Sequence, residues 1–135
     1  MQSQSNGDGT QPKLRVLLID DDPLVGVAFS RLLNPFNVTF AQSAVGGLAR
    51  VQAGGKFDAI VCDMYMPGMN GMQFYDEVAM VSQRLARQII FVTGSASAPE
   101  AAAFLERTSN ICLAKPVKRE ALKSAVVAAS KVMRP

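Results

Sequence analysis

The chain contains no histidine, and it has only two cysteines among its 135 residues. The missing histidine excludes catalytic triads built on that residue and histidine-containing zinc sites. Cys62 and Cys112 lie in separate apolar segments and do not form a C-x-x-C pair. We interpret both as small core hydrophobes on strands that are too far apart for a disulfide.

Long apolar runs and clusters of basic residues are also missing. No run approaches the roughly 18 residues that a membrane span needs, and no signal-peptide pattern opens the chain. We therefore predict a cytoplasmic protein without membrane contact. The formal net charge is +3, but Lys118 and Arg119 are the only adjacent basic pair. Because the basic residues form no stripe, we expect no direct contact with nucleic acid.

The overall composition is that of one globular domain. Apolar residues make up 49% of the chain and charged residues 19%, and the length leaves no room for a second folded domain. Residues 1–12 are polar and aperiodic, which predicts a flexible lead-in or linker. The folded domain is expected to cover residues 13–135.

Short apolar runs alternate with helical patterns along this domain. This alternation predicts an α/β fold with a parallel sheet and helices on both faces. Pro23 fits the first position of one helix, and Ser97 to Glu100 reads as a capping box with Pro99 in the same role. Gly46 and Gly47 should weaken another helix. The five expected strands are 14–19, 37–41, 58–62, 88–92 and 110–114.

Polar residues follow these strands at the points where each strand ends. Asp20 and Asp21 come after the first strand, Asp63 after the third, Thr93 after the fourth and Lys115 after the fifth. The carboxyl ends of parallel strands meet at one edge of the sheet, where ligands bind in open α/β folds. The sequence therefore predicts that these residues converge there.

Three converging carboxylates form an all-oxygen site, which suits a hard cation such as Mg²⁺. A neighbouring Asp22 is explained more simply as the N-cap of the helix that starts at Pro23. A carboxylate beside a metal ion can attack phosphorus and form an acyl phosphate. Asp63 is best placed for this role, with Lys115 and Thr93 as donors to phosphoryl oxygens.

Four motifs carry a resemblance to a known family. They are Asp20–Asp21, the D-x-x-M-P-G-M-N-G stretch from Asp63 to Gly71, V-T-G from Val92 to Gly94, and Lys115–Pro116. Together, in this order, they resemble the response-regulator receiver domain, the phosphorylatable switch of two-component signalling. The resemblance covers residues from about Lys13 to Met133.

The resemblance implies a flavodoxin-like, doubly wound, five-stranded parallel sheet of order 2-1-3-4-5 with five helices. It implies a switch that takes its phosphoryl group from a phosphohistidine, which must come from a sensor histidine kinase or a histidine phosphotransfer protein. The low-charge helices are similar to those of receivers in hybrid sensor kinases. The implied site consists of Asp63 as phosphoacceptor, Thr93 and Lys115 as phosphoryl contacts, and Asp20, Asp21, Asp63 and the main-chain carbonyl of Tyr65 as Mg²⁺ ligands.

Three positions sharpen or complicate the resemblance. Receivers commonly hold the Lys115–Pro116 peptide cis, and we expect this here. The family usually has an aromatic switch residue where this chain has Cys112, so signalling by an aromatic swing is not expected. The ring of Tyr65 either shields an acyl phosphate from water or simply lies on the surface. By family analogy, residues 97–132 form the face that binds an unknown downstream protein or a second copy of the chain.

Two other functions fit parts of the pattern. The Asp20-x-Asp22 pair, a later Thr and a downstream Lys resemble haloacid-dehalogenase-type phosphohydrolases, in which Asp20 would be the nucleophile. That family needs further acids after the lysine, and here only Glu120 follows Lys115. A pure interaction module that has lost phosphorylation is the third hypothesis, and the complete set of acceptor residues argues against it.

Overall fold

A five-stranded parallel sheet forms the centre of the molecule. The computed structural model describes residues 5–6, 9–10, 13–94 and 98–132. In sequence order the sheet strands follow the predicted arrangement 2-1-3-4-5, which confirms the fold class. Across the sheet, these strands are β4 (Asn37–Ala41), β3 (Arg15–Ile19), β5 (Ala59–Asp63), β6 (Ile89–Thr93) and β7 (Cys112–Ala114).

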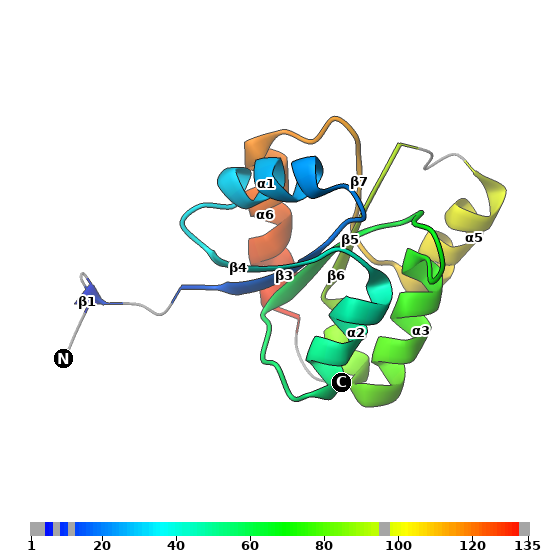
Figure 1. Cartoon of the computed structure of the whole chain (residues 1–135), viewed down its shortest axis with the longest axis horizontal. Helices are drawn as coiled ribbons and strands as arrows, with labels where there is room; N and C mark the ends of the chain where they lie inside the picture. The colour runs from blue at the N-terminus through cyan, green and yellow to red at the C-terminus, as the bar shows by residue number, and fades with distance from the viewer. Residues whose placement is uncertain (1–4, 7–8, 11–12, 95–97, 133–135) are drawn as a thin grey trace.

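Helices cover both faces of this sheet (Figure 1). On one face α1 (Pro23–Leu32) packs beside α6 (Arg119–Ser130). The other face carries α2 (Ala44–Gln52), α3 (Gly71–Val81) and α5 (Pro99–Thr108). This two-sided covering is what the alternating strand and helix signals predict.

The described residues contain six helices rather than the predicted five. The additional element is α4 (Gln83–Arg87), which directly follows α3. Ser82 ends α3 and also caps α4, because its hydroxyl accepts a hydrogen bond from the Leu85 N–H at 3.1 Å. A serine that serves two helices in this way leaves no gap in the helical pattern, so the sequence does not reveal the break.

Side chains from β3 fill two separate cores, one on each face of the sheet. Leu17 and Ile19 are buried with α2 and α3, whereas Val16 and Leu18 are buried with α6. Burying a side chain of this size contributes about 2 kcal/mol. Since both faces are covered, the strand is apolar from Val16 to Ile19 and does not alternate there.

The starts of α1 and α5 differ in how well the sequence predicted them. Asp22 caps α1, its carboxylate accepting the Leu24 N–H at 2.9 Å, and Pro23 is the first helical residue, as predicted. The predicted capping box of α5 is wrong. Its N-cap is Ala98, which has no side-chain acceptor, because Pro99 already occupies the first helical position. Ser97 lies outside the described residues.

Gly47 has a packing role that the sequence did not reveal. A Cβ atom at this position would collide with the side chain of Ile19. The glycine therefore lets α2 lie close against β3. This contact explains why a residue that costs about 1 kcal/mol in helix propensity is present in α2.

The lead-in contains two short strands, β1 (Ser5–Asn6) and β2 (Gly9–Thr10). They pair with each other in antiparallel fashion and form a sheet of their own. Flexibility of residues 1–12 stays a prediction, as does the boundary at residue 13. Among the described residues, no helix is both long enough and apolar enough to span a membrane.

Candidate functional site

The parallel register brings the strand ends into line. Ile19 pairs with Cys62, and Asp63 pairs with Val92. Asp20 therefore leaves the sheet next to the end of β5. Thr93 pairs with Ala114, so Lys115 leaves β7 at the same edge. The structure confirms the predicted convergence of these strand ends.

Three carboxylates form the centre of the site. Asp20, Asp21 and Asp63 each place a carboxylate oxygen within 4.8 Å of the others. Asp20 is only 3% exposed and Asp63 only 9%, whereas Asp21 is exposed. At this separation two carboxylates repel each other by about 3 kcal/mol at an effective dielectric near 20. The cluster therefore needs a positive partner.

Lys115 supplies one positive partner. Its Nζ lies 3.6 Å from Oδ2 of Asp20 and 3.6 Å from Oδ2 of Asp63. The lysine side chain is about one-third exposed, at 33%. One ammonium group thus bridges two nearly buried carboxylates and offsets part of their repulsion. The third acid, Asp21, is exposed to solvent.

The pKa of Asp63 is raised above its ordinary value. Burial is the main cause, because it disfavours the charged form of a carboxyl group. Asp20 and Asp21 raise the pKa further, whereas Lys115 and the backbone N–H of Tyr65 lower it. The net direction shows that Lys115 alone does not fully compensate the negative charge. A second cation would stabilise the ionised carboxylate.

The donor set fits a magnesium ion. All three side chains offer oxygen, which is the ligand atom that Mg²⁺ prefers. One oxygen of Asp20, Oδ1, accepts the Asp22 N–H at 2.9 Å, which leaves Oδ2 directed at Lys115. This hydrogen bond fixes the orientation of the most buried carboxylate. The proposed contribution of the Tyr65 carbonyl stays a prediction.

Two glycines shape the loop after Asp63. Gly68 has a φ of +76°, a conformation that side-chain-bearing residues rarely adopt. A Cβ on Gly71 would lie 2.9 Å from the Asp63 carbonyl oxygen and 3.0 Å from Cα of Met64. The Gly71 N–H instead donates to the Met64 carbonyl at 2.8 Å. The glycines of this motif therefore allow α3 to begin directly against β5, the strand that ends at Asp63.

Asn70 and Gln73 form a capping box at the start of α3. The Asn70 side chain accepts the Gln73 N–H, and the Gln73 side chain accepts the Asn70 N–H, both at 2.9 Å. Sequence reasoning missed this pair, although N-x-x-Q before an apolar segment is the signal for it. The box fixes the far end of the loop that carries Asp63.

Thr93 lies at the end of β6 and is only 1% exposed. The next residue, Gly94, has open space around it, since a Cβ there would meet no atom within 4 Å. Because residue 94 is glycine, no side chain from this position fills the space beside Thr93. Thr93 is placed for the predicted hydroxyl contact, and the contact itself stays a prediction.

Tyr65 connects the loop after Asp63 to α5. Its hydroxyl donates a hydrogen bond to Oε1 of Glu100, at 3.3 Å. Burial and the neighbouring Glu100 carboxylate raise the pKa of the Tyr65 hydroxyl. The sequence did not predict that Tyr65 and Glu100 interact, because the two residues lie far apart in the chain. Whether the ring shields an acyl phosphate stays a prediction.

The cysteines are free, as predicted. Cys62 is fully buried, and its Sγ lies 3.3 Å from the carbonyl oxygen of Asp63. Burial and the neighbouring carboxylates Asp63 and Asp20 raise the pKa of its thiol, which keeps it protonated. Cys112 is half-buried on β7, and burial raises its thiol pKa too. Neither cysteine is suited to act as a nucleophile.

A family profile described as a response regulator receiver domain matches residues 16–127. The transcriptional regulatory protein GlrR of Escherichia coli is 34% identical over 113 residues, which are 82% of this chain and 25% of GlrR. The sensor protein EvgS of the same species is 30% identical over 114 residues, covering 83% of this chain and 9% of EvgS. The chain thus spans a quarter or less of these relatives.

Solved structures show the same fold. A response regulator receiver domain protein from Clostridium thermocellum superposes with a TM-score of 0.77 and 26% identity, covering 87% of this chain and 94% of that chain. The chemotaxis protein CheY4 of Vibrio cholerae superposes with a TM-score of 0.75 and 27% identity, covering 87% and 98%.

Proposed function

Because the chain belongs to the response regulator receiver domain family, we propose that Asp63 is its phosphoacceptor and that Asp20, Asp21 and Asp63 bind Mg²⁺ during phosphotransfer. One observation carries this proposal: the Asp63 carboxylate lies in a cluster with two other acids and 3.6 Å from the Lys115 ammonium. Receiver domains are phosphoacceptor switches of two-component response regulators. The residue assignments and the metal go beyond family membership.

In the proposed reaction, a carboxylate oxygen of Asp63 attacks the phosphorus of a phosphohistidine. The new oxygen–phosphorus bond forms an acyl phosphate while the phosphorus–nitrogen bond breaks, and the histidine nitrogen keeps the electron pair. These 135 residues contain no histidine, so the donor histidine lies outside them, in a sensor histidine kinase or a histidine phosphotransfer protein. Magnesium, when bound, neutralises charge on the transferred oxygens.

Three further residues are proposed to contact the phosphoryl group or the metal. Lys115 already bridges Asp20 and Asp63, so it can pair with a phosphoryl oxygen without leaving the site. The Thr93 hydroxyl is proposed to donate to a second oxygen. The main-chain carbonyl of Tyr65 is proposed as a further metal ligand. The contacts of Lys115 and Thr93 with phosphoryl oxygens form only after phosphorylation, which is how the module would favour its active conformation.

The position of Asp63 favours this function over a phosphohydrolase with Asp20 as nucleophile. Asp20 is almost fully buried, and its two oxygens face the Asp22 N–H and Lys115. Asp63 ends a different strand and has no role in the phosphohydrolase hypothesis. The receiver reading uses both residues.

The output is proposed to be a change in protein contacts through residues 97–132, to a downstream protein or a second copy. Similarity to segments of a transcriptional regulator and of a sensor protein supports a receiver that works beside other domains. A hybrid sensor kinase is our preferred context. The cytoplasmic location also stays a prediction.

The direct test is intact-mass analysis after incubation with Mg²⁺ and a small phosphodonor. The wild-type protein should gain one phosphoryl group, about 80 Da. Asp63→Asn should gain none, because the amide is not a nucleophile. Asp58→Asn, which changes an acid at the opposite edge of the sheet, is the matched control and should be labelled like wild type. Equal labelling of wild type and Asp63→Asn would remove Asp63 from its assigned role.

A further inference from the structure

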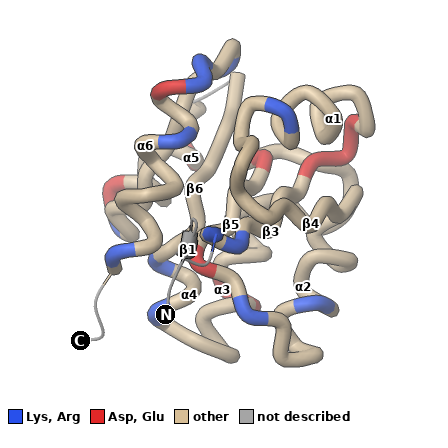
Figure 2. Tube along the Cα trace, turned by 90° about the vertical axis from the view of Figure 1, so that its left-hand side faces the viewer, with Lys and Arg blue, Asp and Glu red and all other residues tan. Residues whose placement is uncertain are grey.

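A second charged region lies at the opposite edge of the sheet, where the strands begin. A crevice of about 670 Å³ opens there between the start of β3, the loop from α2 to β5, and α4. In Figure 2, basic segments lie near the start of β3 and beside α4. The proposed phosphoacceptor role uses none of these residues.

Four cations line this crevice against a single acid. Lys13, Arg15, Lys56 and Arg84 are all exposed, and none of these four forms an ion pair among the described residues. The acid is Asp58, whose Oδ2 already accepts the Arg15 N–H at 2.8 Å. The crevice therefore presents positive charge that the described part of the chain does not neutralise. Such a surface attracts anions, and phosphate groups above all.

The floor of the crevice is apolar. Val51 is buried there, and Leu14, Phe57 and Leu85 are half-buried. Gly55 has no side chain at a point where a Cβ would lie 3.0 Å from the Phe57 ring. One part of the ring thus packs against the glycine, and the rest lines the crevice. An aromatic ring offers a stacking surface for a flat group of a ligand.

The walls are held in place without a ligand. The Gly54 N–H donates to the Val51 carbonyl at 3.1 Å, and the Gly55 N–H donates to the Arg50 carbonyl at 3.0 Å. The Asp58 N–H donates to the Arg15 carbonyl at 2.8 Å. A site that is formed in advance costs less ordering on binding. The volume also lies within the range of small-molecule pockets.

Asp58 is also fixed from the interior. Its carbonyl accepts a hydrogen bond from Nε2 of Gln88 at 2.9 Å, and the same amide donates to the Ala129 carbonyl at 3.2 Å. Gln88 is only 1% exposed. One buried side chain thus ties the crevice floor to α6.

From these features we propose that the crevice binds a phosphorylated small molecule with an aromatic ring, of the nucleotide class. Lys13, Arg15, Lys56 and Arg84 would contact the phosphates, and the ring would stack on Phe57 above the apolar floor. The combination matters, because cations alone fit any anion and an apolar floor alone fits any hydrophobic group. An acidic peptide is the alternative occupant that the test must separate.

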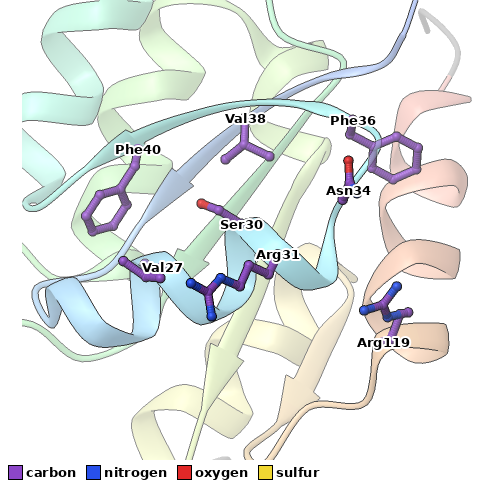
Figure 3. Close-up of a pocket in the computed structure, with 9 residues that line it drawn as sticks. Val27, Ser30, Arg31, Asn34, Phe36, Val38, Phe40 and Arg119 are labelled. Atoms are coloured by element: carbon purple, nitrogen blue, oxygen red, sulfur yellow. The ribbon is translucent and has the colours of Figure 1, made fainter.

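A groove of about 640 Å³ beside α1 provides the comparison (Figure 3). Val27, Val38, Phe36 and Phe40 line it with two arginines, Arg31 from α1 and Arg119 from α6. This groove has half as many cations as the crevice, and they come from separate helices. It serves as the matched control for charge removal.

The experiment is a titration of the whole chain with ADP in the presence of EDTA, which keeps magnesium away from the acidic edge. Amide chemical shifts of Gly54 and Gly55 report on the crevice, and calorimetry gives the Kd. We expect binding with a Kd below about 1 mM. Adenosine, which lacks phosphate, and pyrophosphate, which lacks the ring, should each bind at least tenfold more weakly than ADP.

Variants locate the binding. Lys56→Ala with Arg84→Ala should weaken ADP binding by at least about tenfold. Phe57→Leu keeps the apolar floor but removes the stacking surface. It should weaken ADP binding while leaving the affinity for pyrophosphate unchanged. Arg31→Ala with Arg119→Ala should bind ADP like wild type. Asp63→Asn should also bind normally, so this result is independent of the phosphoacceptor proposal.

Several results would overturn the inference. Unchanged amide shifts of Gly54 and Gly55 at millimolar ADP would show that the crevice does not bind it. ADP and pyrophosphate of equal affinity would show an anion site without ring recognition. Binding of a glutamate-rich peptide in place of ADP would assign the crevice to an acidic protein segment.

Discussion

The two edges of the sheet carry opposite charge, and they hold it in different ways. At the carboxyl edge, Asp20 and Asp63 are almost buried and depend on Lys115. At the amino edge, cations such as Lys56 and Arg84 are exposed to water and line a crevice without an ion pair among the described residues. A buried charge needs a partner to be stable, whereas an exposed charge needs none. Substitutions should therefore affect folding at the first edge and only ligand binding at the second.

The largest expected effect concerns magnesium. Replacing both Asp20 and Asp21 by Asn removes two of the three carboxylates in the cluster and should weaken Mg²⁺ binding by at least about 100-fold. Titration calorimetry with magnesium chloride measures this directly. Asp58→Asn at the opposite edge should bind Mg²⁺ like wild type. Unchanged Mg²⁺ affinity in the double variant would separate the acidic cluster from the metal.

Removal of Lys115 should destabilise the fold. Lys115→Met leaves Asp20 and Asp63 without their shared cation and should lower the free energy of unfolding by about 2 kcal/mol at neutral pH without metal. Lys56→Met at the amino edge should change it by less than about 0.5 kcal/mol. Urea denaturation of the two variants provides the comparison. Similar losses in both would show that the edges do not differ as described.

The pH dependence of the free energy of unfolding should reveal the raised pKa of Asp63. Because the pKa of Asp63 is raised in the folded state, the folded protein binds this proton more tightly than the unfolded chain does. The free energy of unfolding therefore falls as pH rises from the ordinary carboxyl pKa of 3.8 through the raised pKa of Asp63 in the folded protein. Above that window the ionised Asp63 lowers stability.

Asp63→Asn removes the loss of stability that comes from ionising Asp63. In EDTA at pH 7.5 the variant should be more stable than wild type, and the difference should shrink as pH falls. Denaturation curves at several pH values measure it. Asp58→Asn again serves as the control, and a difference independent of pH would contradict the titration of Asp63 as its cause.

The smallest effect is expected for the Tyr65 hydroxyl. Its hydrogen bond to Glu100 is long, at 3.3 Å, and exposed. Tyr65→Phe should therefore change the free energy of unfolding by less than about 0.5 kcal/mol. If the ring shields the acyl phosphate, Tyr65→Phe keeps its lifetime and Tyr65→Ala shortens it. Equal lifetimes in wild type, Tyr65→Phe and Tyr65→Ala would favour the surface interpretation.

The strand order was expected from the family resemblance, whereas the convergence of Asp20, Asp63, Thr93 and Lys115 follows from one rule. Parallel strands end at a common edge, so a polar residue after each apolar run is enough to locate the site. The cis peptide between Lys115 and Pro116 was likewise expected from the resemblance and is present.

Other features depend on contacts that sequence spacing does not encode. The hydrogen bond from Tyr65 to Glu100 joins the loop after β5 to the first turn of α5, and the packing of Gly47 on Ile19 depends on how closely α2 approaches β3. The crevice likewise needs segments from three parts of the chain to meet. Scattered basic residues gave no signal in the linear sequence, and only the fold gathers four of them.

The open space at Gly94 has a consequence for how receivers of this kind could diversify. A Cβ added at position 94, directly after Thr93 at the carboxyl edge, would meet no atom within 4 Å beyond its chain neighbours. Any substitution there adds volume beside Thr93, so it would narrow the approach to this edge while leaving the carboxylates and their lysine unaltered. Reaction speed and metal affinity would then be adjustable as separate traits.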